Sequence, residues 1–170
     1  MKVTIYHIAF SFLMILQMSC AVMLLSTTAN GQTWSLDSEE FEVGDKLIAR
    51  LIFDLDKSAI REENKPLLDS VATFMKANPG VVIEVGQHMD QRWSEVYSYR
   101  LDSKRARSII AYLRNKGIHS ERLHAKGYED RQPLITAEEI AAMDDEASKE
   151  AAYYQNRRTE FKILRVDFDE

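Results

Sequence analysis

The chain has 170 residues, a length that predicts one domain. Hydrophobic residues make up 45% of it, enough to bury a core, so the composition excludes a disordered polyelectrolyte. Its 22 Lys and Arg against 27 Asp and Glu give a net charge of −5. This balance argues against a nucleic-acid partner, because phosphate neutralisation needs a basic face.

Residues 1–31 predict a secretory signal. Lys2 precedes an almost continuous apolar run over residues 8–25, and Ala29 and Gly31 form a small-x-small cleavage pattern. We favour cleavage over an uncleaved anchor, although the run has the length of a short membrane span. The single cysteine, Cys20, lies inside the run without a good lipobox before it, so lipidation is not expected. An exported, periplasmic chain without disulfides follows.

The first part of the expected domain alternates a strand with a helix. Residues 32–45 are acidic and predict a short tether. Residues 46–55 then alternate apolar and polar side chains, which is typical of a strand. An apolar stripe at helical spacing follows Pro66, and this helix ends at the Pro-Gly pair of residues 79–80.

A second strand leads into the most informative stretch of the sequence. Residues 81–85 alternate as a strand, which then passes into a loop that contains Asp90. A charged helix follows and ends near Gly117, a suitable C-terminal cap. Helical spacing places Ser98, Leu101 (or its neighbour Asp102) and Arg105 on one face of this helix.

The last third of the chain predicts two strands separated by an inserted helix. Residues 123–128 form the third strand. Thr136 and Glu139 make a capping box for a helix over about 136–155, which we interpret as surface elaboration. The final strand covers residues 159–168, where a change in the phase of apolar residues indicates a bulge or burial on both faces.

These elements predict an α+β fold. Strands that alternate with helices give a two-layer sandwich: a small mixed sheet of about four strands with helices packed on one face. The domain covers residues 46–168.

Two interpretations of Asp90 and Arg105 follow from the residues. A carboxylate at a strand end and a guanidinium on a helix face can form an ion pair that holds the helix to the strand. They can also bind a small zwitterion, with Asp90 receiving the ammonium and Arg105 holding the carboxylate through its planar fork.

The order of motifs resembles the OmpA-like peptidoglycan-binding domain family. The family signature reads G-H-T-D, ten residues, then L-S-x-x-R-A. Matching residues in this chain are His88, Asp90, Leu101, Ser103 (offset by one place), Arg105 and Ala106. Residues 53–57, 117–118, 122–123, 125, 127–128, 133 and 156–158 also match, so the resemblance covers residues 46–166.

The resemblance implies a binding protein without catalytic activity, metal or cofactor. Its ligand would be peptidoglycan, held through the diaminopimelate of an uncrosslinked stem peptide, with Asp90 on the ammonium and Arg105 on the carboxylate. The resemblance also implies outer-membrane proteins as partners. The family pattern also places Phe53 and Asp54 at the pocket edge. The other implied ligand-binding residues are His88, Ser98, Leu101 and Arg157.

Three departures from the family pattern leave a second function open. Met89 replaces the usual threonine, Trp93 replaces glycine, and Ser98 replaces asparagine. Lost hydroxyl and amide contacts would each cost about 1 kcal/mol of ligand binding. The alternative is therefore a protein-interaction domain that keeps the fold and has weakened or lost peptidoglycan binding.

A metal-dependent enzyme is a third, less favoured hypothesis. His88 and Asp90 share a strand phase, and His119 and His124 could complete a ligand set. The sequence contains no zinc-binding helix motif and no phosphate-binding glycine loop to support it.

Overall fold

A four-stranded mixed sheet with strand order β1-β4-β2-β3 forms the framework of the protein. The computed structural model describes residues 33, 35–36, 41–92 and 95–169, with the backbone only for residues 95–99. The expected signal at 1–31 lies outside these residues. Within the described part, no helix is both long enough and apolar enough to cross a membrane.

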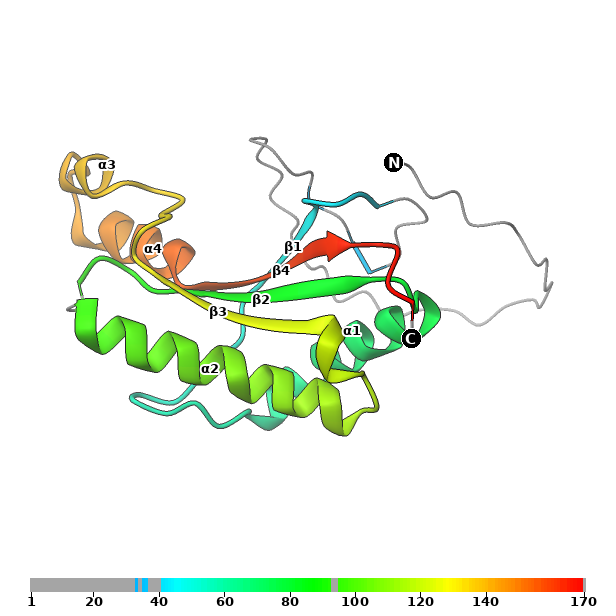
Figure 1. Ribbon diagram of the computed structural model, residues 1–170. Coiled ribbons are helices and arrows are strands. Elements are labelled where there is room, and N and C mark those ends of the chain that lie inside the picture. Colours follow the sequence, from blue (N-terminus) through cyan, green and yellow to red (C-terminus); the bar gives the residue numbers. More distant parts are fainter. Residues whose placement is uncertain (1–32, 34, 37–40, 93–94, 170) are drawn as a thin grey trace, which may run out of the picture.

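The elements follow one another in the predicted alternation (Figure 1). The strands are β1 (Lys46–Ala49), β2 (Val82–His88), β3 (Leu123–Glu129) and β4 (Arg158–Arg165). The helices are α1 (Lys65–Ala77), α2 (Glu95–Asn115), α3 (Ala137–Ala141) and α4 (Glu146–Asn156), with single 3-10 turns at Glu62–Asn64 and Ser120–Arg122.

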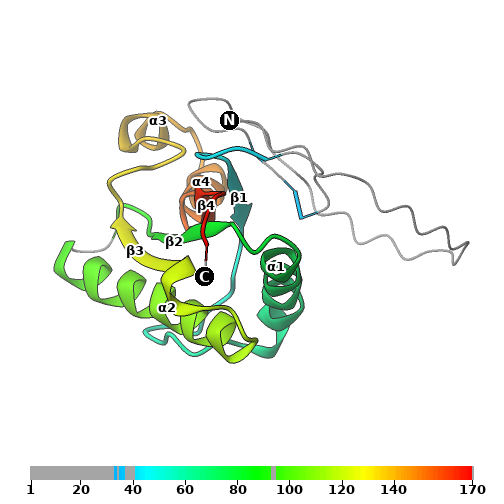
Figure 2. The same cartoon turned by 45° about the vertical axis from the view of Figure 1, so that its right-hand side comes forward.

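Helices α1 and α2 cover one face of the sheet, which confirms the predicted two-layer α+β sandwich (Figure 2). β2 and β3 are parallel, while β4 runs antiparallel to both β1 and β2. Apolar side chains of the sheet, including Ile83, Val85 and Phe161, meet Leu68 and Ile109 of the helices in a continuous buried core. Helices α3 and α4 lie at the end of the sheet where β4 begins (Figure 1).

Most local predictions are confirmed. Gly117 ends α2 with φ +91°, and the amide of Ile118 donates to the carbonyl of Leu113, as in a glycine C-cap. The predicted bulge in the last strand is present, because Val82 pairs with Arg165 while Ile83 pairs with Ile163.

The first strand is shorter than predicted. Its pairing with β4 runs from Lys46 to Ala49 and ends there, and residues 50–56 then leave the sheet. The side chain of Asn64 holds this segment by accepting from the Ile52 amide at 2.9 Å and donating to the Ile52 carbonyl at 2.7 Å. Alternation over residues 46–55 was therefore misleading, because a side chain from the next element takes the backbone bonds that a strand would need.

The inserted region forms two helices where the sequence predicted one. The Thr136–Glu139 capping box is present and begins α3. Asp145 then caps α4 by accepting from the amide of Ser148 at 2.8 Å. An N-cap residue has a non-helical backbone, so Asp145 interrupts the stripe that predicted one continuous helix.

Part of the expected tether packs on the domain. Phe41 is buried, and its ring meets that of Phe74 edge-on at 5.3 Å. The Gly44 amide donates to the Ile163 carbonyl at 2.8 Å. The described residues of this lead-in, from 41 onward, therefore belong to the folded unit.

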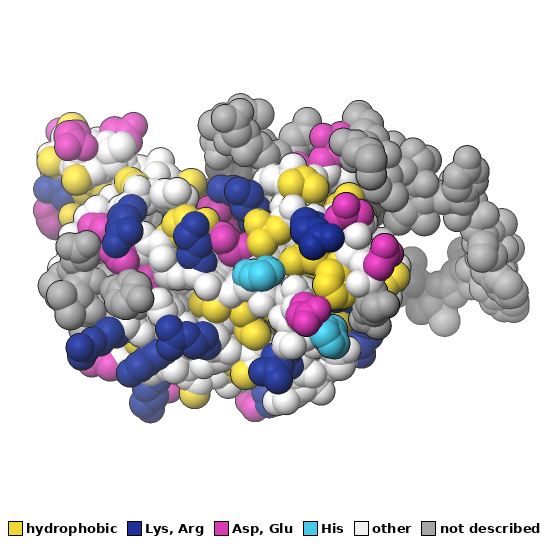
Figure 3. Space-filling model, viewed as in Figure 1, with side chains coloured by type: hydrophobic (Ala, Val, Ile, Leu, Met, Phe, Trp, Pro, Cys, Tyr) yellow, Lys and Arg dark blue, Asp and Glu magenta, His cyan; other side chains and the backbone are white. Residues whose placement is uncertain are grey.

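The surface is charged but mixed. Lys and Arg side chains gather over the N-terminal half of α2, where Arg100, Lys104 and Arg107 are exposed (Figure 3). Acidic side chains interrupt the basic ones elsewhere on the same face (Figure 3).

Candidate ligand-binding pocket

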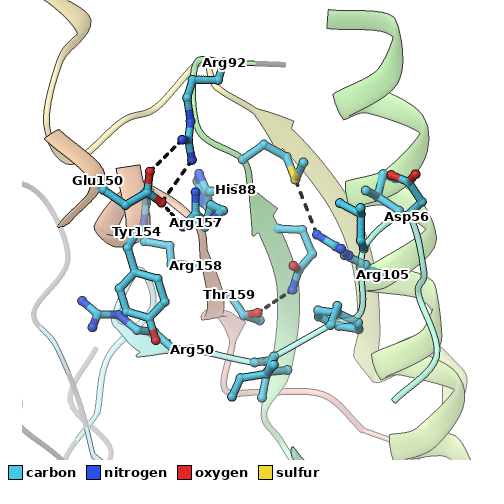
Figure 4. Close-up of a pocket in the computed structure, with 17 residues that line it drawn as sticks. Arg50, Asp56, His88, Arg92, Arg105, Glu150, Tyr154, Arg157, Arg158 and Thr159 are labelled. Carbon is cyan, nitrogen blue, oxygen red and sulfur yellow. Dashed lines mark hydrogen bonds and ion pairs between the residues drawn. The ribbon is translucent and has the colours of Figure 1, made fainter. Parts of the chain in front are cut away.

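A pocket opens where β2 ends and β4 begins. Segment 50–56 and α2 form one side of it, and α4 forms the other (Figure 4). Its lining residues are Arg50, Leu51, Ile52, Phe53, Leu55, Asp56, Gln87, His88, Met89, Arg92, Leu101, Arg105, Glu150, Tyr154, Arg157, Arg158 and Thr159. Five of these are arginines and two are acids, so the lining is positively charged.

Arg105 stands on the α2 side, where no acid of the described residues forms an ion pair with it. Its Nε donates to the Lys57 carbonyl at 3.1 Å and its Nη2 to the Asp54 carbonyl at 3.3 Å. The guanidinium lies 4.8 Å from the ring centroid of Phe53, and Nη1 is 3.7 Å from the Met89 sulfur. None of the ion pairs among the described residues includes Arg105. Burial lowers the pKa of Arg105 from its ordinary value. We call Phe53, Met89 and Arg105 the open wall.

Asp90 lies on the other side of the pocket, and both oxygens of its carboxylate already accept hydrogen bonds from the protein. Its side chain is 0% exposed. Oδ1 accepts from the amide and Nε of Arg92 at 3.0 and 3.2 Å, and Oδ2 accepts from Nη2 of Arg92 at 2.9 Å and from Arg157. Burial alone would raise the pKa of Asp90, but these arginine bonds outweigh it and hold the pKa below its usual value.

Glu150 completes this charged group from α4. Its Oε2 accepts from Nη1 of Arg92 at 2.7 Å, while Oε1 lies 3.4 Å from Nη2 of Arg92 and 3.3 Å from Nη2 of Arg157. The two arginines lower the pKa of Glu150. We call Asp90, Arg92, Glu150 and Arg157 the paired wall, whose two cations and two anions balance.

A buried polar network lies behind the paired wall. Glu160 receives Nε of Arg158 at 2.8 Å and the Lys46 ammonium at 3.0 Å. His88 stacks on Tyr128 with a centroid distance of 4.6 Å, and its Nε2 lies 3.6 Å from Oε1 of Glu160. Neither ring nitrogen of His88 makes a hydrogen bond within the described structure, and burial lowers the pKa of the imidazole. We therefore assign His88 as neutral.

The pocket floor is fixed by long-range bonds. Nε2 of Gln87 donates to Oγ1 of Thr159 at 2.5 Å, joining β2 to β4. The Asp102 carboxylate accepts from the Glu129 amide at 2.8 Å and fastens α2 to β3. A Cβ at position 127 would lie 2.3 Å from that carboxylate, so only glycine permits this approach.

The structure brings together five of the eight predicted site residues. Phe53, His88, Leu101, Arg105 and Arg157 line the pocket.

The other three are placed differently. Asp90 pairs with Arg92 and Arg157 and not with Arg105, so of the two interpretations the Asp90–Arg105 ion pair is wrong. The Asp54 carboxylate pairs with Arg61 at 3.0 Å. It is the backbone carbonyl of Asp54 that accepts a hydrogen bond from Arg105. The side chain of Ser98 lies outside the described part of the chain, as does Trp93.

The lining residues that sequence reasoning missed include Arg50, Arg92, Glu150 and Tyr154. Two of them lie on α4, so the expectation that the inserted region only elaborates the surface is wrong. Arg92 was within reach of sequence analysis, since a side chain two residues after Asp90 can fold back onto it. Glu150 carried no distinguishing signal among the acids of its helix.

The metal-site hypothesis gains no geometric support. His119 and His124 are both exposed, and neither lines the pocket. In the described ranges, no group of three His, Cys, Asp or Glu side chains is placed to hold a metal ion.

Comparisons with known proteins match this architecture. Residues 52–146 match the OmpA family. Outer membrane protein A of Bordetella avium is 34% identical over 117 residues, 68% of this chain and 55% of that protein. The peptidoglycan-associated lipoprotein of Haemophilus influenzae is 29% identical over 106 residues, 62% of this chain and 63% of that protein. The chain thus spans little more than half the length of these relatives.

The fold agrees with a solved structure as well. The peptidoglycan-associated lipoprotein from Burkholderia pseudomallei superposes with a TM-score of 0.54 at 24% identity, covering 66% of this chain and 87% of that one. At this identity the likeness concerns the fold alone.

Proposed function

This chain belongs to the OmpA family, and from that premise we propose that it binds cell-wall peptidoglycan without catalysis, through the diaminopimelate of the stem peptide. Relatives named peptidoglycan-associated lipoprotein support the class of ligand. The diaminopimelate group is the finer part of the proposal, because its free end offers a carboxylate and an ammonium on one carbon.

The open wall is the observation that carries the proposal. Arg105 is held in place by two carbonyls and a ring, and its charge has no carboxylate partner within the described residues. A guanidinium that is partly buried and unpaired is stabilised by an incoming carboxylate, which its planar fork can bind through two parallel bonds. The stem peptide is rich in carboxylates.

The pocket rim suits the apolar parts of the same ligand. Ile52, Leu55 and Tyr154 are exposed by 50%, 73% and 47%. All three line the pocket, so they can cover the methyl groups and methylene chain of a stem peptide. Charge-assisted bonds of about 1.5–3 kcal/mol each support only weak binding of one stem. The repeated stems of the wall raise the overall affinity by avidity.

Export and a place at the outer membrane complete the proposal. The expected signal at 1–31 would carry the domain into the periplasm, where peptidoglycan lies. Relatives named outer membrane protein A and peptidoglycan-associated lipoprotein support that location. Partner proteins at the outer membrane are part of the same proposal.

Co-sedimentation with purified sacculi tests the function. The full chain, recovered from the cell envelope after export, is expected to pellet with sacculi, and free diaminopimelate is expected to release it. Retention that diaminopimelate does not reduce would contradict the assigned ligand group. Absence of the protein from the pellet would favour the protein-interaction domain.

A further inference from the structure

The saturation of Asp90 raises the question of where the ligand's ammonium binds. A carboxylate offers about four lone-pair positions. Asp90 already accepts four hydrogen bonds, three from Arg92 and one from Arg157, and none of its surface is exposed. An ammonium could reach it only by displacing a guanidinium that is bound through several atoms.

Glu150 differs from Asp90 in both respects. Its side chain is 56% exposed and it lines the pocket. Oε2 accepts a single bond from Arg92 at 2.7 Å, so a lone pair of that oxygen remains available, and the two contacts of Oε1 are long at 3.3 and 3.4 Å. Glu150 therefore keeps acceptor capacity that faces the pocket.

The position of Glu150 also fits a ligand held by Arg105. The two side chains stand on opposite walls, with the pocket between them (Figure 4). A ligand that engages both must carry a carboxylate at one end and a cation at the other. A stem peptide meets this requirement, because the methylene chain of diaminopimelate separates its free ammonium from other carboxylates of the stem.

Asp56 is the other acid of the lining, and it is placed on the wrong side for this role. It belongs to the segment that packs against Arg105, with φ +56°, and lies near that guanidinium (Figure 4). An ammonium beside Asp56 would lie next to the unpaired charge of Arg105. On the paired wall, the charges already balance, so an added ammonium meets less repulsion.

We propose that Glu150 of α4 receives the ammonium of the stem peptide, in the role that the family motif assigns to Asp90. The inference rests on the proposed function and adds a specificity-determining residue to it. It also assigns a function to the inserted region, since α4 supplies the carboxylate that selects a ligand with a cationic end.

Two soluble stem peptides test the assignment. They are identical except that the free amino group of diaminopimelate is acetylated in one, which removes its charge. The full chain, recovered from the envelope, is titrated with each peptide by calorimetry. We expect the wild type to bind the free amine about fivefold more tightly, the size of one partly exposed charged contact.

The variant Glu150→Gln keeps the shape of the side chain and removes its charge. We expect it to lose the preference by binding the free-amine peptide more weakly, with binding of the acetylated peptide unchanged. Glu146→Gln is the matched control, because Glu146 lies one turn earlier on α4 and, among the described residues, pairs with Lys149 and not with an arginine of the pocket. It should keep the full preference, and thermal melts should show both variants folded.

Four results would overturn the inference and leave the proposed function intact. Glu150→Gln could keep the wild-type preference, or could bind both peptides more tightly, which would mean that Glu150 competes with ligand carboxylates for Arg92 and Arg157. The variant Asp56→Asn could abolish the preference for the free amine, which would assign the ammonium to Asp56 and not to Glu150. The wild type could also bind both peptides equally. A wild type that binds neither peptide nor sacculi would overturn the proposed function as well, so the two failures are distinct.

Discussion

The two walls of the pocket solve the problem of a partly buried guanidinium in opposite ways. On the paired wall, Arg92 and Arg157 share Asp90 and Glu150, and every charge has an opposite neighbour. On the open wall, the partners of Arg105 among the described residues are two carbonyls, a ring and a sulfur atom. The charges of the paired wall balance without a ligand, whereas the charge of the open wall does not.

This difference shows that a residue can keep its position in a family motif without keeping the binding role of that position. Asp90 occupies the family position and keeps its charge, but its oxygens stabilise the protein itself. Arg105 occupies its family position and remains available. Changes to Asp90 should therefore affect mainly stability, whereas changes to the open wall should affect mainly binding.

The largest effect on stability is expected from Asp90→Ala. It leaves Arg92 and Arg157 beside a cavity without their shared anion, and losing one partner of a buried ion pair is strongly destabilising. Since both arginines are partly exposed, we expect a loss of about 3 kcal/mol in the free energy of unfolding. Urea denaturation measures it. A loss below about 1 kcal/mol would show that the paired wall does not stabilise the fold.

A smaller loss is expected when the support of the open wall is removed. Asn64→Ala deletes both bonds to Ile52 and frees the segment that carries Phe53 and the carbonyls around Arg105. We expect about 1–2 kcal/mol of destabilisation together with weaker binding of sacculi. The exposed helix residue Ser70, changed to Ala, is the control and should have almost no effect. Unchanged binding by a destabilised Asn64→Ala protein would show that this segment does not hold Arg105 in place.

Acid should weaken the paired wall before the open wall. The folded-state pKa values of Asp90 and Glu150 are both lowered, so their stabilisation is complete above the unfolded values of about 3.9 and 4.3 and is lost as pH falls through the folded values. The free energy of unfolding should therefore decrease between pH 5 and pH 3. Asp90→Asn should decrease less over this range, and an equal decrease would assign the acid sensitivity to other groups.

The smallest effect is expected from Tyr154→Ala. The Tyr154 ring lies 4.8 Å from the Arg50 guanidinium and 5.7 Å from that of Arg157, in a half-exposed position. Exposed cation–π contacts contribute about 0.5–1 kcal/mol, so affinity for stem peptide should fall only two- to fivefold, with stability nearly unchanged. A loss as large as that of an Arg105 variant would place the main contact on α4.

The parts of the fold that sequence predicted well are those set by local patterns. Alternation located β2, an apolar stripe located α1, and Gly117 located the end of α2. The end of β1 was missed because Asn64, from a later segment, takes the backbone bonds of Ile52. The break before α4 was missed because Asp145 could equally have been an exposed helix residue.

The site shows the same division. Arg105 could be predicted from motif spacing, since its surroundings come from the family fold. The pairing of Asp90 with two arginines could not be predicted. One partner, Arg157, lies 67 residues away in sequence, and the other, Arg92, reaches Asp90 only because its side chain folds back. The contribution of α4 was missed because the acids of an inserted segment look alike until the fold shows which one meets the pocket.

The most direct test of the central claim is the affinity of Arg105 variants for the diaminopimelate-containing stem peptide, with a thermal melt of each protein. We expect Arg105→Ala to remain folded and to bind at least tenfold more weakly, because the carboxylate loses its charge-assisted bonds. Arg105→Lys should be nearly as weak, because an ammonium cannot form the bidentate contact. A folded Arg105→Ala protein that binds the stem peptide like the wild type would contradict the account, since the open wall would then not be the ligand site.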